Sequence, residues 1–133
     1  MADVTATYEG ELCVKCVHTR TQTSVMAESK IQDFGHDDSF TPIDLFGSSF
    51  GACLLVTMGY YANRHNIDIT GAEVDVTTTL QGWNITEMAI VIRMPPNSYP
   101  DKEKKALEKC IDTCPIHNLV KPEVKQNISF IWL

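Results

Sequence analysis

The chain has 133 residues and a mass of 14.9 kDa, a length that predicts a single domain spanning residues 1–133. Hydrophobic residues make up 44% and charged residues 21%, a balance that excludes a disordered chain and indicates a globular protein. Eleven Lys and Arg against seventeen Asp and Glu give a formal net charge of −6. Because an acidic surface repels phosphate groups, we expect no nucleic-acid partner and no membrane partner.

The cysteines and the first residues indicate where the protein works. Five cysteines are an odd number, which does not suit a framework of disulfides. The chain begins Met1-Ala2-Asp3-Val4-Thr5, without the basic and apolar regions of a secretory signal. We therefore expect a reducing, cytoplasmic location.

The first forty residues are expected to form strands and a loop. Three short runs with strand composition are separated by turn-forming residues, which predicts a meander of three strands. The runs are Val4–Tyr8, Leu12–His18 and Ser24–Glu28. The stretch Asp33–Ser39 has no apolar periodicity and is expected to be a loop.

A long helix is predicted from Thr41 to His65, with signals at both of its ends. Thr41 is a suitable N-cap, Asp44 completes a capping box, and Asn66 can adopt the left-handed conformation after the last turn. Between Asp44 and Arg64 lie nineteen uncharged residues. Serines and glycines make this stretch a poor membrane span, so we expect protein to cover the helix on nearly all sides. A chain of 133 residues has little material for that, which implies a partner subunit.

The second half of the chain alternates between strand and helix patterns. Apolar residues at every second position predict an antiparallel hairpin, and a later alternation predicts a final strand. A helix with an apolar face and a short helix opened by a proline are expected between them. The ranges are Val74–Leu80 and Met88–Met94 for the hairpin, Ser98–Thr113 and Pro115–Leu119 for the helices, and Val124–Trp132 for the last strand.

Four of the cysteines have a spacing that could suggest zinc. Cys13 and Cys16 form a C-x-x-C pair, while Cys110 and Cys114 lie four residues apart on a helix. Residues three apart in an extended strand point to opposite faces, however. We therefore interpret Cys13 and Cys16 as ordinary strand residues and expect no metal.

The remaining thiols leave two interpretations open. Cys53 lies in mid-helix beside small residues, so it is either a buried core cysteine or a nucleophile with room for a substrate. Cys114 precedes Pro115 at the start of a short helix, whose positive end favours a thiolate. His117 is either a hydrogen-bonding partner of this thiol or a surface residue, and Cys110 is expected to pack in the core.

Two motifs together resemble the OsmC/Ohr family. The run from Phe40 to Cys53 reads FTPIDLFGSSFGAC and is similar to the family pattern P-x-[ED]-L-L-x-x-[SA]-x-[GA]-x-C. Cys114-Pro115-Ile116-His117 matches the distant C-P-[VI] of the same family. The resemblance covers the whole chain. It implies an α+β, OsmC-like fold with antiparallel sheets around a long buried central helix, in an intertwined homodimer.

The resemblance also implies an activity, the thiol-dependent reduction of organic hydroperoxides. Cys53 occupies the position of the peroxidatic thiolate, which becomes a sulfenic acid, and Cys114 that of the thiol that resolves it to a disulfide. A small or protein dithiol would then restore both thiols, and no cofactor is expected. The alternative is a dimer that senses redox state or binds a small molecule without turnover. In that case Phe46, Phe50 and Tyr60 would line an apolar pocket.

Hydroperoxide reductases of this family place a glutamate and an arginine around the peroxidatic sulfur. The candidates for supporting roles here are Asp44, in the acidic position of the motif, Arg20 and His117. Asp44 and Cys53 are separated by about 900° around and about 13 Å along an unbroken helix, which places them on opposite faces. Either the helix breaks near residues 47–49, or Asp44 is a cap.

Overall fold

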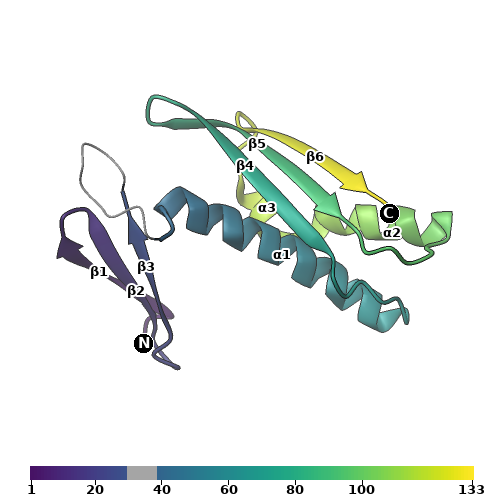
Figure 1. Cartoon of the computed structure of the whole chain (residues 1–133), viewed down its shortest axis with the longest axis horizontal. Helices are drawn as coiled ribbons and strands as arrows, with labels where there is room; N and C mark the ends of the chain where they lie inside the picture. Colours follow the sequence, from purple (N-terminus) through teal and green to yellow (C-terminus); the bar gives the residue numbers. More distant parts are fainter. Residues whose placement is uncertain (30–38) are drawn as a thin grey trace. The chain divides into compact units, whose positions relative to one another are not determined.

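The first three strands form an antiparallel sheet, as the sequence predicts. They are β1 (Val4–Gly10), β2 (Cys13–His18) and β3 (Ser24–Glu28), in the order β1-β2-β3 (Figure 1). The computed structural model describes residues 1–29 and 39–133, so only Ser39 of the predicted loop lies within the described part. The sheet belongs to the first of two compact units, Met1–Phe46 and Gly47–Leu133. The single-domain assignment stays a prediction.

The long helix α1 (Pro42–Arg64) begins and ends where its sequence signals predict. The Asp44 N–H donates to Thr41 Oγ1 at 3.1 Å, and the Thr41 N–H donates to Asp44 Oδ2 at 3.0 Å. These reciprocal bonds are the predicted capping box. Asn66 has the expected positive φ of 56°. Because α1 is unbroken across residues 47–49, Asp44 serves as a cap.

The second unit contains a sheet in the order β4-β5-β6, made of β4 (Glu73–Gln81), β5 (Asn84–Arg93) and β6 (Lys125–Ile131). β4 and β5 form the predicted antiparallel hairpin, but β6 pairs parallel with β5. The α+β fold is therefore confirmed, while the expectation of purely antiparallel sheets is wrong for β6. A crossover causes the difference, because helices between β5 and β6 return the chain to the end at which β5 began.

The crossover contains three short helical elements. These are α2 (Asp101–Lys109), the 3-10 helix η2 (Cys110–Thr113) and α3 (Pro115–Leu119). The sequence predicts the bounds of α3 correctly, but it places the start of α2 three residues early, at Ser98. Pro100 explains the shift, since a proline disfavours helical conformation in the residue before it.

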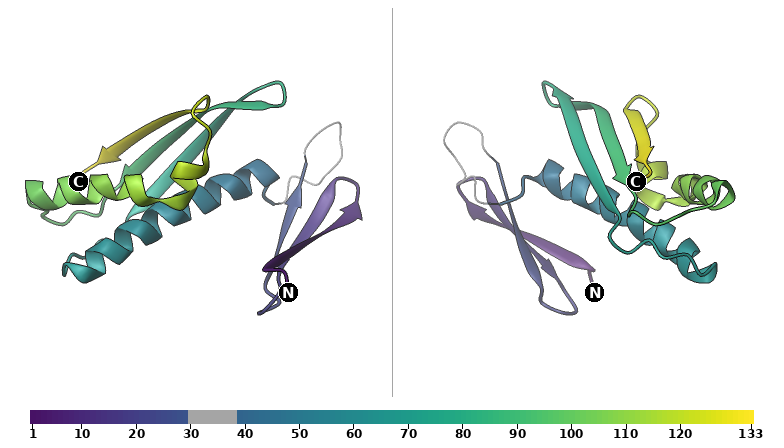
Figure 2. Two further views of the ribbon diagram at one scale, coloured as in Figure 1. Left: turned by 180° about the vertical axis from the view of Figure 1, so that it is seen from behind. Right: turned by 45° about the vertical axis from the view of Figure 1, so that its right-hand side comes forward.

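The core of the second unit lies between its helices and one face of its sheet. Figure 2 shows α1, α2 and α3 on the same side of β4-β5-β6. Every fourth residue along one stripe of α1 is buried: Phe50, Leu54, Met58 and Ala62. Gly47 and Gly51 lie against the side chains of Val76 and Val74 on β4. The opposite side of α1 exposes Val56 and Tyr60, so one chain covers only part of the helix. α1 is long and apolar enough to span a membrane, but this stripe makes it a core helix.

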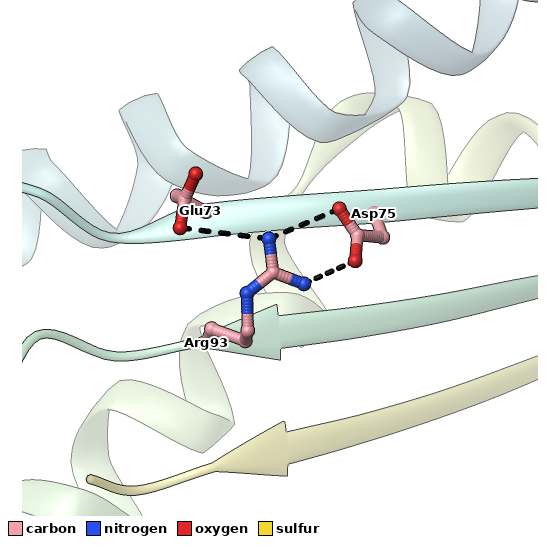
Figure 3. A network of polar contacts seen from close by, with 3 residues as sticks. All are labelled: Glu73, Asp75 and Arg93. Carbon is pink, nitrogen blue, oxygen red and sulfur yellow. Dashed lines mark hydrogen bonds and ion pairs between the residues drawn. The ribbon is translucent and has the colours of Figure 1, made fainter.

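An exposed ion network joins the two strands of the hairpin (Figure 3). The Arg93 guanidinium donates to both carboxylate oxygens of Asp75, and its Nη2 lies 3.5 Å from Glu73 Oε1. The hydrogen bond from Arg93 holds the pKa of Asp75 below its usual range. Because the acidic groups are exposed, the network adds little to the stability of the β4-β5 pair.

Candidate functional site

Cys53 and Cys114 come from separate elements of the second unit and meet side by side. Cys53 lies in the middle of α1 and is half-buried, whereas Cys114 is fully buried at the N-cap of α3. A hydrogen bond joins the two thiols, with Cys114 as the donor and the Cys53 sulfur as the acceptor. The structure thus brings together the two cysteines that the motifs single out.

Three hydrogen bonds make Cys53 the more acidic thiol. Burial raises the pKa of Cys53, but hydrogen bonds from the Ile116 N–H, the Cys114 thiol and the Thr57 hydroxyl outweigh it. The net effect is a pKa below the ordinary value for a cysteine. Since the thiolate is the nucleophilic form, Cys53 is the sulfur prepared for attack.

Cys114 has the opposite character. Burial raises the pKa of Cys114, and its hydrogen bond to Cys53 raises it further, against opposing bonds from the N–H groups of Ile116 and His117. The sequence-based argument that the start of α3 makes Cys114 a thiolate is therefore wrong. At Cys114 burial raises the pKa by more than the helix N-terminus lowers it. The hydrogen bond from the Ile116 N–H also lowers the pKa of Cys53, which is partly exposed.

The local sequence explains why the first turn of α3 has free amides for sulfur. Cys114 is the N-cap of α3 and Pro115 follows it. Pro115 has no N–H, so Ile116 and His117 carry the first amide donors of the helix. The Cys-Pro pair in the sequence is the signal for this arrangement.

Thr57 is a site residue that the sequence analysis missed. It lies four residues after Cys53 on α1, and its hydroxyl donates to the Cys53 sulfur. Residues four apart on a helix are neighbours on one face, so this spacing was a signal that could have identified it.

His117 is neither a free surface residue nor a direct partner through its ring. Its Nδ1 lies 2.6 Å from Gln126 Oε1, and Gln126 Nε2 donates to the His117 carbonyl oxygen at 3.3 Å. The His117 ring centroid is 6.5 Å from that of Phe50. Phe50 is fully buried and Tyr60 is 66% exposed in the single chain, and the apolar pocket expected around them in a dimer stays a prediction.

A comparison with protein families assigns the chain. Residues 35–129 match the family model described as OsmC-like protein. The chain belongs to the OsmC-like family. The match includes both cysteine motifs, so the family resemblance read from those motifs is confirmed.

Solved structures agree with an OsmC-like fold over the whole chain. A protein of Psychrobacter arcticus 273-4, named for an osmotic-stress-induced and detoxification response, has a TM-score of 0.89 at 25% identity, covering 98% of this chain and 96% of its own. An OsmC-like protein from Mycoplasma pneumoniae has a TM-score of 0.82 at 20% identity, with coverages of 100% and 97%. An organic hydroperoxide resistance protein OsmC from Legionella pneumophila has a TM-score of 0.72 at 17% identity, with coverages of 98% and 97%. No protein with a curated description matches the chain.

Asp44 and the arginines, the side chains weighed as supporting groups for the peroxidatic thiol, occupy other structural positions in this OsmC-like protein. Asp44 completes the capping box of α1. Arg20 lies on the exposed turn between β2 and β3. Arg93 pairs with Asp75, and the Arg64 guanidinium lies 5.6 Å from the ring centroid of Tyr60.

The other three cysteines occupy structural positions. Cys13 and Cys16 lie on β2, as predicted, and the Cys13 thiol lies 3.6 Å from Glu28 Oε2. Cys110 is buried and donates to the Ala106 carbonyl at 3.4 Å, which confirms its expected place in the core. Within residues 1–29 and 39–133, no group of three His, Cys, Asp or Glu side chains is arranged to hold a metal ion.

The capping role of Asp44 predicts the effect of Asp44→Asn. Asparagine keeps a capping oxygen but loses the charge that favours a helix start, so we expect a cost of at most about 1 kcal/mol. Urea unfolding measures this cost, and iodoacetamide kinetics at Cys53 should match wild type. A tenfold slower alkylation of Cys53 with unchanged stability would contradict a purely structural Asp44.

Proposed function

We propose that this protein reduces organic hydroperoxides with a pair of cysteines, Cys53 as the peroxidatic and Cys114 as the resolving residue. The observation that carries the proposal is their direct hydrogen bond, with a lowered pKa at Cys53 and a raised pKa at Cys114. Attack on the peroxide requires a thiolate, which Cys53 supplies, and formation of the disulfide requires a neighbouring thiol, which Cys114 supplies. The relative from Legionella pneumophila, named for organic hydroperoxide resistance, supports the same chemistry.

The first step is attack on the peroxide. The Cys53 thiolate attacks the terminal oxygen of R–O–O–H, an S–O bond forms, and the O–O bond breaks. Cys53 becomes a sulfenic acid, and the alkoxide leaving group takes a proton to become the alcohol. The hydrogen bonds from Ile116 and Thr57 favour the thiolate that begins this step.

The second step forms a disulfide. The sulfur of Cys114 attacks the sulfur of Cys53, an S–S bond forms, and the hydroxyl of the sulfenic acid leaves as water with the proton from Cys114. Two thiols and one hydroperoxide therefore give one disulfide, one alcohol and one water. An external small or protein dithiol reduces the disulfide by exchange, and the protein needs no bound cofactor. A cytoplasmic location supplies such reductants.

The proposal also includes a homodimer. Ala27 is the one buried apolar side chain among the described residues of Met1–Phe46, which is too small a core for a stable sheet. That sheet also has four exposed large apolar side chains: Val4, Tyr8, Val25 and Met26. Val56 and Tyr60 are exposed on α1 in the same way. A second copy of the chain offers complementary apolar surfaces of this kind.

Sedimentation tests the dimer. We expect a species of twice the 14.9 kDa chain mass at micromolar concentration, because the exposed apolar side chains need cover. The midpoint of thermal unfolding should rise with protein concentration. A folded monomer with a concentration-independent midpoint would contradict the dimer.

The experiment that tests the activity measures consumption of cumene hydroperoxide with an excess of dithiol. We expect turnover, and one equivalent of peroxide without reductant should give an intramolecular Cys53–Cys114 disulfide in peptide mapping. Before oxidation, Cys53 should react with iodoacetamide faster at pH 7 than Cys13 and Cys110. Burial raises the pKa of both of those thiols, and hydrogen bonding to Glu28 adds to the effect at Cys13.

A second function is a dimer that senses redox state or binds a small molecule without turnover. It is favoured by the neutral donors at Cys53, which are an amide, a thiol and a hydroxyl. Arg64 hydrogen-bonds to Tyr60, and Arg93 pairs with the acidic residues of β4, so both guanidinium groups already have partners. Formation of the disulfide without consumption of peroxide beyond one equivalent would select this function over the enzyme.

A further inference from the structure

We propose that Gln126 is a positioning residue for the cysteine pair, because it holds His117 and with it the first turn of α3 against the two sulfurs. The inference rests on the proposed function, and it adds a residue that belongs to neither cysteine motif. Gln126 lies on β6, far along the chain from Cys53, and contacts His117 in α3.

The two hydrogen bonds of Gln126 fix the state of the His117 ring. Gln126 Nε2 donates to the His117 carbonyl oxygen at 3.3 Å, which leaves Oε1 as an acceptor. Oε1 lies 2.6 Å from His117 Nδ1, so Nδ1 must carry a proton. In the neutral ring, Nε2 is then the unprotonated nitrogen. One side chain thus sets both the tautomer of His117 and the position of its backbone.

The backbone of His117 is part of the thiol site. Its N–H hydrogen-bonds to Cys114, and the N–H of the preceding Ile116 contacts both sulfurs. α3 has only five residues, and a helix of this length is not stable by itself. Contacts with other elements must therefore hold the turn in place.

Two side chains from other elements hold the first turn of α3 in place. Gln126 holds His117 from β6, and Phe50 packs near the ring from α1, one turn before Cys53. Gln126 is the polar exception on its side of β6, where the alternate positions Ile128 and Phe130 are apolar. Gln126 is half-buried, and both polar groups of its side chain are bonded to His117, which offsets the cost of removing them from water.

The next residue on the strand provides a matched control. Asn127 is also an amide on β6, but it faces the other side of the sheet, where its Nδ2 donates to Glu87. Its replacement removes a hydrogen bond from the same strand without touching α3. Asn127→Ala should therefore leave Cys53 unchanged.

The first measurement is ¹⁵N NMR of the His117 ring in the wild-type protein and in Gln126→Met. We expect a protonated Nδ1 in neutral wild-type His117 and loss of this preference in the methionine variant, which keeps the length of the side chain. Gln126→Glu retains an acceptor for Nδ1 and should retain the tautomer. A wild-type ring protonated on Nε2 alone would overturn the proposal without any variant.

The second measurement is the pH profile of Cys53 alkylation, followed by peptide mapping. We expect Gln126→Met to move the midpoint to higher pH and to slow alkylation at pH 7 by roughly threefold to tenfold, because less of the thiol is ionised. Gln126→Glu keeps an acceptor for Nδ1 but cannot donate to the His117 carbonyl, so it should retain the tautomer without restoring the rate. An unchanged midpoint in folded Gln126→Met would overturn the positioning role.

These measurements separate the two proposals, because alkylation does not require turnover. Peroxide consumption by wild type together with an unshifted Gln126→Met profile would reject the role of Gln126 and keep the enzyme. A shifted profile in a protein that consumes no peroxide would keep the role of Gln126 and reject the peroxidase.

Discussion

Cys53→Ser is expected to abolish hydroperoxide consumption, whereas Cys114→Ser should consume about one equivalent and then stop. The difference follows from the order of the steps. Without Cys53 no thiolate attacks the O–O bond, while without Cys114 the sulfenic acid forms but has no neighbouring thiol to resolve it. Cumene hydroperoxide consumption with a dithiol measures turnover, and dimedone should label Cys53 in Cys114→Ser.

Cys110→Ser is the matched control for this pair. Cys110 is also buried and lies one turn before Cys114, but its thiol donates to the Ala106 carbonyl. A serine can make the same bond, so turnover should stay near wild type. Full turnover by Cys114→Ser, or a first-equivalent reaction that survives in Cys53→Ser, would reject the assigned roles.

The sequence identifies the two cysteines but not the groups that distinguish them. Each cysteine lies in a motif of adjacent residues, which can be recognised without a structure. The relative acidity of Cys53 and Cys114 depends on which sulfur is buried and which accepts the Ile116 amide. Both conditions arise only when α1 and α3 pack together, so the local argument for a Cys114 thiolate failed. Gln126 was missed for the same reason, since its partner His117 belongs to another element.

Local signals predict most of the secondary structure and fail where direction matters. The capping box at Thr41 and the helix start at Pro115 depend on neighbouring residues, and both are found as predicted. Alternating apolar residues predict that 124–132 is a strand but carry no information on its direction beside β5. The parallel pairing of β6 follows from the crossover, which is a property of the whole unit.

Leu54→Ala is expected to lower the free energy of unfolding by about 2–5 kcal/mol. Leu54 is fully buried in the stripe of α1 that packs toward β4-β5-β6, so its truncation leaves a cavity in the core of a single chain. Urea unfolding monitored by circular dichroism measures the loss. A cost below about 1 kcal/mol would mean that this side of α1 is not packed as described.

Val56→Ala, two residues further along α1, separates the contribution of one chain from that of the dimer. Val56 is 72% exposed, so in a monomer its truncation should change the free energy of unfolding by no more than about 0.5 kcal/mol. In the proposed dimer a second copy covers this side of α1, and the same change should destabilise by about 1 kcal/mol or more. It acts by weakening association, so the loss should be largest at high protein concentration and should shrink as the protein is diluted. Unfolding of both variants at two protein concentrations distinguishes the cases. The dimer is supported if the cost of Leu54→Ala is independent of concentration and the cost of Val56→Ala depends on it. A Val56→Ala variant equal to wild type at both concentrations would place the dimer contact elsewhere than on this side of α1.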